Sequence, residues 1–248
     1  MRIARALSSL GYCSRREADR LIEQRRVAVN GEILQTPVAL VDVERDAIAV
    51  DGVTIGLVAT MTYALYKPVG VTSTVRDPHA GRTVVQLVDS PVRLYPVGRL
   101  DKESEGLILL TNDGELAQRV THPRYGVEKE YEALVDRVPE PATLDAIRAG
   151  VVLDGRPRRP LRVAAIQRDS GAWVRLVLAE GINHEVRRIL GVVGLSVRRL
   201  VRTRIGPVRL GRLRPGGSRL LSSEEIEALN DAKRSGGVSG LNSRGLSQ

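Results

Sequence analysis

The segment 98–101 reads Gly-Arg-Leu-Asp and sets a carboxylate beside a guanidinium, which makes it the first candidate for chemistry. An ionised Asp101 can act as a covalent nucleophile toward a sugar carbon or a base. Gly98 has no side chain and permits a close approach of the backbone. The same residues also fit a buried Asp101 whose charge is satisfied by Arg99. The segment by itself therefore leaves a catalytic and a structural interpretation open.

Three further segments carry residues that could serve a site: 66–71 (YKPVGV), 129–131 (KEY) and 180–188 (EGINHEVRR). Taken alone, Tyr131 fits a core or edge aromatic, and the arginines at 187–188 fit a solvated or phosphate-facing helix surface. The chain has no G-x-x-x-x-G-K-S/T phosphate loop, no H-E-x-x-H zinc motif, no G-x-S-x-G elbow and no dinucleotide-binding fingerprint. The single Cys13 excludes an internal disulfide, and the three histidines lack ligand spacing. We expect neither a metal nor a cofactor.

The charge balance of the chain points to a polyanionic partner. The 248 residues include 38 Lys and Arg against 29 Asp and Glu, which gives a formal net charge of +9. Nucleic acid is the usual partner of such a surface, although a basic surface can also serve only to keep a protein soluble. Most of the basic residues are Arg, whose planar fork suits phosphates and bases. No apolar run reaches the ~18 residues of a membrane span, so we expect a cytoplasmic protein.

Residues 1–50 are expected to form a small domain of two helices and a hairpin. Apolar residues at 3, 7 and 10 have helical spacing up to Gly11, and Ser14 with Glu17 forms a capping box that opens a second helix. The Asn-Gly pair at 30–31, between two short apolar runs, is a strong hairpin signal. Arginines surround the second helix, and those expected to bind RNA are Arg15, Arg16, Arg20, Arg25 and Arg26. A generic helix–hairpin cap with solvated arginines is the alternative.

A linker at 51–62 is expected to lead into a larger domain at 63–230. Strands are predicted at 63–66, 129–138, 160–169 and 173–179. Helices are predicted at 141–149, at 183–193 and from a capping box of Ser222 and Glu225 to near residue 230. Strands and helices without a regular β-α-β alternation favour an α+β fold over a doubly wound sheet. The Ser- and Gly-rich tail at 231–248 is predicted to be disordered.

Taken together, in their order and spacing, the four segments resemble the RsuA/RluB family of pseudouridine synthases over roughly residues 1–230. The stretch GRLDKESEGLILLTNDGELA at 98–117 is the most specific match, and RTRIGPVRLGRLRPG at 202–216 favours this branch of the synthases. The pattern SRREAD…VAVNG is similar to the S4 RNA-binding module. The resemblance implies an S4-like domain followed by a catalytic domain on a mixed, largely antiparallel β-sheet with flanking helices.

The resemblance also implies roles by position. Asp101 would be the essential catalytic carboxylate. Tyr131 would pack on the target ring and is a candidate for proton transfer. Arg187 would be the basic residue that pairs with Asp101. The residues expected to contact RNA near the site are Arg99, Lys67 and Arg188.

Two positions depart from the pattern that we expect of the family. Glu185 stands where Gln or a similar neutral residue is usual, and Ile189 stands where Met is frequent. Neither belongs to the inferred catalytic trio.

The implied activity is the isomerisation of one uridine in ribosomal RNA to pseudouridine. The partner would be ribosomal RNA or a ribosomal subunit precursor, and the protein would be a monomer. The stretch 196–206 favours the large subunit over the small subunit. The alternatives are a non-catalytic ribosome-assembly factor and a glycosidase, which would need a second acid such as Glu103 or Glu105.

Overall fold

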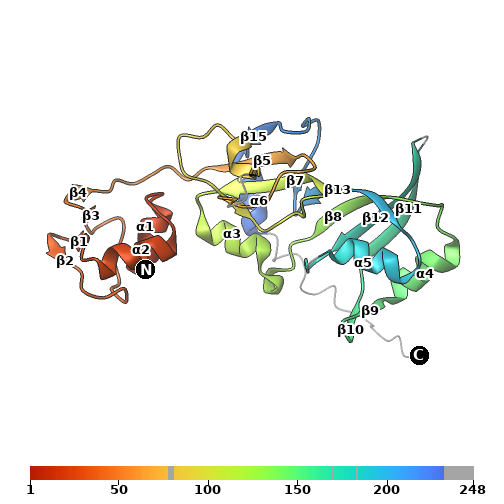
Figure 1. Ribbon diagram of the computed structural model, residues 1–248, viewed down its shortest axis with the longest axis horizontal. Coiled ribbons are helices and arrows are strands. Elements are labelled where there is room, and N and C mark those ends of the chain that lie inside the picture. Colours follow the sequence, from red (N-terminus) through yellow and green to blue (C-terminus); the bar gives the residue numbers. More distant parts are fainter. Residues whose placement is uncertain (78–80, 169, 183, 232–248) are drawn as a thin grey trace, which may run out of the picture.

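The computed structural model describes residues 1–77, 81–168, 170–182 and 184–231. The chain forms a small N-terminal part, red to orange in Figure 1, and a larger part built on one long sheet. Within these ranges no helix is long and apolar enough to cross a membrane. The tail predicted to be disordered lies outside the described residues except for Asp231.

The N-terminal part contains the predicted helices and hairpin. Helices α1 (Ile3–Ser9) and α2 (Arg15–Glu23) pack their apolar faces into one cluster with the strands. Ser14 caps α2, since its side chain accepts a hydrogen bond from the backbone N–H of Glu17. Strands β1 (Val27–Val29) and β2 (Glu32–Ile33) pair across Asn30 and Gly31, whose φ angles are 52° and 85°. Two positive φ angles define the type I′ turn that the Asn-Gly pair predicts.

The segment expected to be a linker begins instead with a strand of the first domain. Strands β3 (Ile48–Val50) and β4 (Val53–Thr54) form a second hairpin, so the small sheet has the order β2-β1-β3-β4. The backbone N–H of Ile55 donates to the carbonyl of Ile48 at 2.8 Å, and its side chain packs against the domain's core. The expected boundary at residue 50 was therefore too early, because the Asp-Gly turn at 51–52 closes a hairpin rather than ending a domain.

The larger part is built on one nine-stranded sheet. Seven strands follow the order β11-β12-β8-β13-β7-β5-β15, with β14 beside β13 and β6 beside β7. All neighbouring pairs are antiparallel except β7 with β13, which confirms a mixed, largely antiparallel sheet. The strands are β5 (Thr62–Lys67), β6 (Tyr95–Val97), β7 (Glu105–Thr111), β8 (Lys129–Val135), β11 (Arg162–Arg168), β12 (Gly171–Leu178), β13 (Val197–Ile205), β14 (Val208–Arg209) and β15 (Ser218–Leu220).

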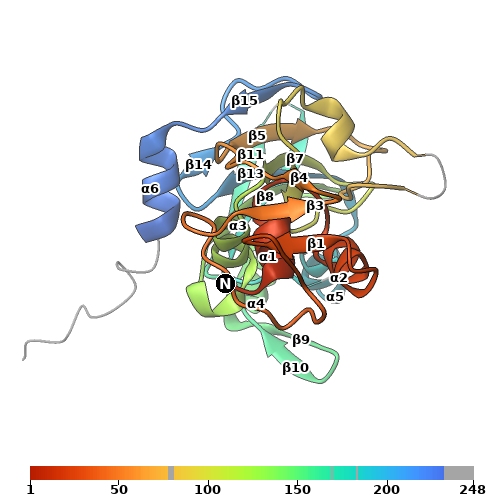
Figure 2. The same cartoon turned by 90° about the vertical axis from the view of Figure 1, so that its left-hand side faces the viewer.

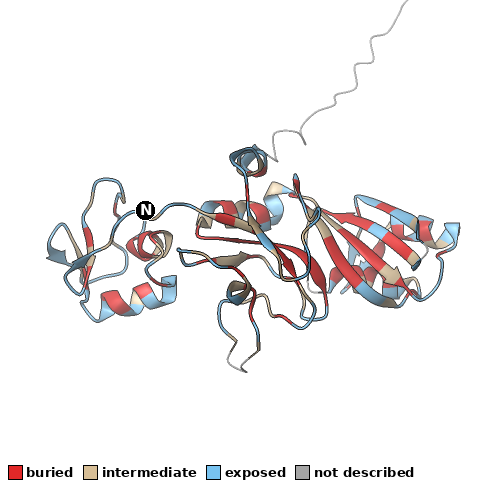
Figure 3. Cartoon of the chain, turned by 90° about the horizontal axis from the view of Figure 1, so that it is seen from above, coloured by how far each residue is buried: buried red, intermediate tan, exposed pale blue. Residues whose placement is uncertain are grey.

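Helices pack on this sheet and complete the core (Figure 2). They are α3 (Gly114–Thr121), α4 (Pro141–Ala149), α5 (Glu185–Val192) and α6 (Ser223–Asp231). The same part of the chain also contains 3-10 turns at Val84–Leu87 and Pro123–Tyr125 and a separate hairpin of β9 (Val151–Leu153) and β10 (Arg156–Arg158). Ser222 and Glu225 exchange the two hydrogen bonds of the predicted capping box at α6. Burial is greatest along the central strands, as Figure 3 shows.

The parallel contact between β7 and β13 depends on a glycine. Gly106 pairs with Arg202 across it, and a Cβ at Gly106 would lie 2.4 Å from the backbone oxygen of Arg202. The φ of Gly106 is +106°, which side chains also disfavour. On the other edge of β7 Gly106 pairs with Lys67, and Arg202 pairs in turn with Tyr131. One row across four strands therefore brings these residues together beside the loop that leads into β7.

Candidate active site

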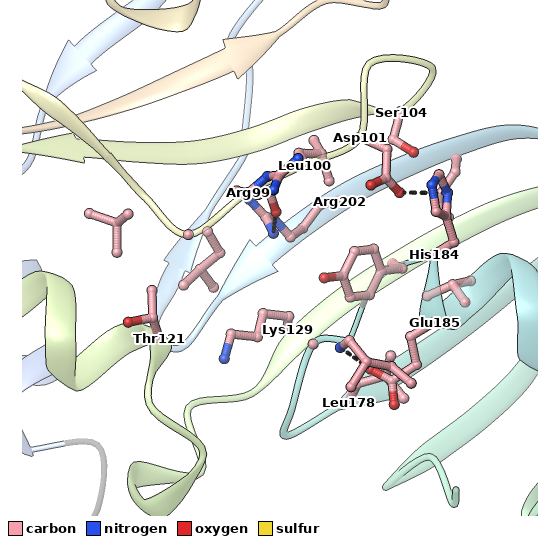
Figure 4. A pocket seen from close by; sticks show the side chains of 18 of the residues that line it. Arg99, Leu100, Asp101, Ser104, Thr121, Lys129, Leu178, His184, Glu185 and Arg202 are labelled. Carbon is pink, nitrogen blue, oxygen red and sulfur yellow. Dashed lines mark hydrogen bonds and ion pairs between the residues drawn. The ribbon is translucent and has the colours of Figure 1, made fainter. Parts of the chain in front are cut away.

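A pocket of ≈ 480 Å³ opens where this row meets the loop 98–104 (Figure 4). Asp101 enters it from the loop and Tyr131 from β8, while His184 and Glu185 contribute from the start of α5. Tyr131 is 8% exposed, so its ring is largely sheltered by the pocket wall. The structure thus brings together two of the three residues that the sequence predicts as catalytic.

Asp101 has an imidazole as its nearest polar partner. Nδ1 of His184 lies 3.2 Å from Oδ2 of Asp101, and the two side chains are 44% and 24% exposed. His184 stands just before α5 with φ 53°, a left-handed conformation that turns the chain into the helix. The sequence analysis assigned no role to His184, because its contact with Asp101 spans 83 residues of chain and no local pattern reports it.

The loop 98–104, which carries Asp101, is held by hydrogen bonds from a neighbouring loop. The hydroxyl of Ser73 donates to the carbonyl of Leu100 at 2.7 Å and accepts from its N–H at 3.0 Å. The N–H of Gly70 donates to the carbonyl of Lys102 at 2.8 Å. Bonds on both sides of Asp101 fix its backbone before any ligand arrives, as a catalytic group requires.

Arg187 does not pair with Asp101 in the described residues, contrary to the expectation from the resemblance. Its guanidinium donates to the carbonyl of Val197 at 2.9 Å and to that of Glu103 at 3.4 Å. Arg187 therefore joins α5 to the start of β13 and to the loop two residues beyond Asp101. Its contacts are those of a positioning residue.

Lys67 and Arg188 do not fit the RNA contacts expected of them. Lys67 is 0% exposed, and its ammonium donates to the carbonyls of Pro68 and Lys102 at 3.0 and 3.4 Å. Burial lowers its pKa to about 8, and the nearby Asp101 opposes that shift. Because the Lys67 side chain is fully buried, the structure does not offer it for the predicted RNA contact. The guanidinium of Arg188 is paired with Asp154 at 2.6 Å. Arg99 lines the pocket, and its RNA contact stays a prediction.

Two cations in the pocket were missed by the sequence analysis. Arg202 is 4% exposed; it donates to the carbonyls of Leu107 and Arg99 at 2.7 and 3.3 Å, and its guanidinium carbon lies 6.0 Å from the centre of the Tyr131 ring. Lys129 precedes Tyr131 by two residues on β8, hence on the same face. Burial, together with Arg202, lowers the pKa of Lys129 to about 8. The period of two in the KEY segment could have revealed Lys129.

The arginines of the first domain differ in whether an acidic side chain pairs with them. Arg26 is bound to Asp51 through contacts of 2.6 and 2.8 Å, and Arg20 pairs with Glu17 at 3.3 Å. Of the five arginines predicted to bind RNA, Arg15, Arg16 and Arg25 are exposed and form no ion pair within the described ranges. These three are the better candidates for contacts with phosphate.

No three His, Cys, Asp or Glu residues in the described part of the chain stand close enough to hold a metal ion.

The sequence matches the RNA pseudouridylate synthase family over residues 62–191 and the S4 domain over residues 1–46. A protein of Aquifex aeolicus named as an RNA pseudouridine synthase is 39% identical over 232 residues, 92% of this chain and 93% of that protein. Ribosomal large subunit pseudouridine synthase B of Bacillus subtilis is 32% identical over 232 residues, 92% of this chain and 95% of that protein.

The fold agrees with these matches. A crystal structure of a pseudouridylate synthase superimposes with a TM-score of 0.65 at 30% identity, covering 92% of this chain and 99% of the other. With both domains matched in sequence and the fold matched along nearly the whole chain, the protein belongs to the RNA pseudouridylate synthase family, a family of isomerases, and carries an S4 domain at its N-terminus.

Proposed function

We propose that this protein converts one uridine of ribosomal RNA into pseudouridine and that Asp101 is the carboxylate that performs the chemistry. The observation that carries the proposal is the shared pocket, in which Asp101 faces the space beside Tyr131. Asp101 is supported as the reacting group because it is ionisable, partly exposed to the pocket and fixed at its backbone by the bonds around Leu100 and Lys102.

The reaction sets demands that this pocket can meet. The bond between C1′ of the ribose and N1 of uracil breaks, the base turns, C5 bonds to C1′, and the C5 proton leaves. A base stacked in a helix cannot turn, so the uridine must flip out, at about a few kcal/mol. Tyr131 offers a flat face on which the detached ring stays in register. No atom is gained and no electron is transferred overall, so the net reaction calls for no cofactor.

RNA outside the target nucleotide is held by basic residues of both domains in this proposal. Three unpaired arginines of the first domain, Arg15, Arg16 and Arg25, suit phosphate contacts, and Arg99 lines the pocket that would receive the target uridine. We place the protein in the cytoplasm as a monomer that acts on ribosomal RNA or on a ribosomal subunit precursor. The large subunit is favoured because the Bacillus subtilis relative carries that substrate in its name.

A comparison of ribosomal RNA with and without the gene tests the substrate. Pseudouridines are mapped in both ribosomal subunits from a strain that lacks this protein. We expect one position of large-subunit RNA to remain uridine, and we expect wild-type protein but not Asp101→Asn to restore it. A lost site in small-subunit RNA would change the substrate, and unchanged maps would favour a non-catalytic assembly factor.

A further inference from the structure

Two cations face the pocket on the side away from the Asp101–His184 pair, as Figure 4 shows for Lys129 and Arg202. Arg202 is the register partner of Tyr131 on the neighbouring strand, and Lys129 lies two residues before Tyr131 on the same face of β8. The strands that carry Tyr131 and Arg202 therefore bring two cations to the pocket that Asp101 also lines.

Arg202 keeps one donor free in the described structure. Two of its nitrogens bond the carbonyls of Leu107 and Arg99, which fixes the plane of the guanidinium. The second terminal nitrogen, Nη2, is buried and has no hydrogen-bond partner among the described residues. A buried donor without an acceptor costs about 1–3 kcal/mol, and more when charged. The charge of Arg202 is therefore held in one place at the pocket wall with an incomplete set of acceptors.

Lys129 is also without a fixed partner. Its ammonium makes no hydrogen bond or ion pair with the described residues, although it lines the pocket. The charged groups that act on it are Arg202 and Glu185. Burial raises the pKa of Glu185, whose carboxylate is engaged by the N–H of Ile182 at 3.1 Å. Two cations therefore stand against one carboxylate at this end of the pocket, which leaves the balance of charge positive.

The chemistry of the proposed reaction creates an anion at that end. When the C1′–N1 bond breaks heterolytically, its electron pair stays on uracil, and the charge spreads over N1, O2 and O4. C5 then returns a pair to C1′ as the new bond forms, the C5 proton is lost, and N1 gains a proton. Asp101 is itself negative and cannot stabilise the uracil anion. Cations that are fixed before the bond breaks can do so, because they need no reorganisation.

We propose that Arg202 and Lys129 form a subsite for the anion of the detached uracil, with Lys129 Nζ donating to a carbonyl oxygen of the base and the fixed charge of Arg202 beside it, and that Lys129 is a further catalytic residue. The inference rests on the proposed function. It separates the roles of the pocket: Asp101 serves the ribose end, and the two cations serve the base.

Substitution of Lys129 tests the subsite, because Lys129 makes no structural hydrogen bond. Lys129→Met keeps the length of the side chain and removes the charge, while Lys129→Arg keeps the charge. In single-turnover assays we expect Lys129→Met to lower the rate constant by about 100-fold, the effect of losing one such donor, and Lys129→Arg to restore most of it. RNA affinity should change little. Arg162→Met, which removes an exposed charge outside the pocket, is the matched control.

The alkaline limb of the rate profile supplies a second readout. Protonated Lys129 is the active form, so the wild-type rate should fall as pH rises through the pKa of Lys129, about 8 in the free protein. Lys129→Arg stays charged in this pH range and should lose that alkaline limb. Lys67 has a pKa of about 8 as well, so a limb that persists in Lys129→Arg would be assigned to Lys67. Glu185→Gln leaves Lys129 in place and should move the limb to lower pH, because Glu185 favours the charged lysine. This variant also tests the subsite if Lys129→Met fails to fold.

A change of substrate tests whether the subsite acts on negative charge. Fluorine at C5 withdraws electrons and stabilises the uracil anion, so RNA with 5-fluorouridine at the target should show a smaller Lys129→Met defect in glycosidic bond cleavage. A wild-type rate in Lys129→Met, or a defect confined to RNA affinity as for a phosphate contact, overturns the inference. Absence of pseudouridine formation by the wild-type protein would instead overturn the proposed function.

Discussion

Nδ1 of His184 lies 3.2 Å from Oδ2 of Asp101, so the free protein holds its candidate catalytic carboxylate with an imidazole, while Arg187 is engaged by backbone carbonyls. The His184 side chain is 44% exposed, and water can replace it when it is removed. Arg187 connects α5 with β13 and with the loop 98–104, and water cannot reproduce that connection. The two residues therefore have different expected effects.

Substitution of His184 should be tolerated. A contact between side chains this exposed contributes about 0–1 kcal/mol even when both are charged, so we expect His184→Gln to change the rate of pseudouridine formation by no more than about fivefold. Arg187→Met should lower the free energy of unfolding by about 2 kcal/mol through the loss of charged hydrogen bonds. Rate measurements and denaturant titrations check both. A loss of 100-fold or more in His184→Gln would make His184 part of the chemistry.

Gly106 should accept no side chain. The Cβ of Gly106→Ala would lie 2.4 Å from the oxygen and 2.6 Å from the nitrogen of the Arg202 backbone, at a φ of +106°. We expect the parallel β7–β13 contact to break, with loss of activity and a lower Tm. Gly191→Ala in α5 is the control, because its Cβ meets nothing within 4 Å at an ordinary φ; it should be neutral or slightly stabilising. Equal Tm values for the two variants would contradict the role of Gly106.

Lys67 should make stability rise with pH. Burial depresses its pKa to about 8 in the folded state, so the unfolded state holds more protons between about pH 8 and the ordinary value of 10.5. Stability therefore rises with pH across that window. Lys67→Met lacks this dependence, and from pH 7 to pH 9 the wild-type protein should gain about 1 kcal/mol relative to it. Denaturant titrations at both pH values measure the difference in free energy of unfolding between the wild type and Lys67→Met. A difference that does not change with pH would show that folding does not lower the pKa of Lys67.

Arginines of the first domain should differ in their effect on RNA binding. We expect the double variant Arg16→Gln and Arg25→Gln to flatten the slope of log Kd against log salt by roughly 1.5, because each lost phosphate contact removes roughly 0.7–0.9. The double variant Arg20→Gln and Arg26→Gln should flatten it less, since both charges are already paired. A larger change of slope in the Arg20 and Arg26 double variant would show that these arginines break their ion pairs with Glu17 and Asp51 in order to bind RNA.

Sequence patterns of a few residues predicted those turns and helix caps that are formed by hydrogen bonds between near neighbours in the chain. The turn at Asn30 and the cap at Ser14 each follow from residues that bond within a few positions, and both formed as expected. The boundary near residue 50 was wrong because a two-residue strand such as β4 is too short to show a period. The burial of the Lys67 side chain likewise depends on contacts with other strands and loops, which no single segment of sequence determines.

Arg202 shows most clearly why part of the site escaped sequence analysis. In a regular strand Arg202 and Arg204 would share a face. The β8–β13 register shifts between them, so Arg202 faces the pocket beside Tyr131 while Arg204 pairs with Glu128 on the opposite face. Bulges of this kind re-aim side chains next to active sites. Asp101 and Tyr131 were predicted because the resemblance carries them by position, whereas nothing in the resemblance predicts the bulge that aims Arg202.

The central claim is that Asp101 performs the chemistry, and Asp101→Asn tests it most directly. The amide keeps the size of the side chain but cannot act as a carboxylate, and phosphate contacts elsewhere should hold RNA affinity within about tenfold, or ~1.4 kcal/mol. The measurement is release of tritium from C5-labelled uridine in ribosomal RNA, beside a binding titration and a thermal melt. We expect no detectable release by a folded variant that still binds RNA. Release at the wild-type rate by that variant would contradict the claim.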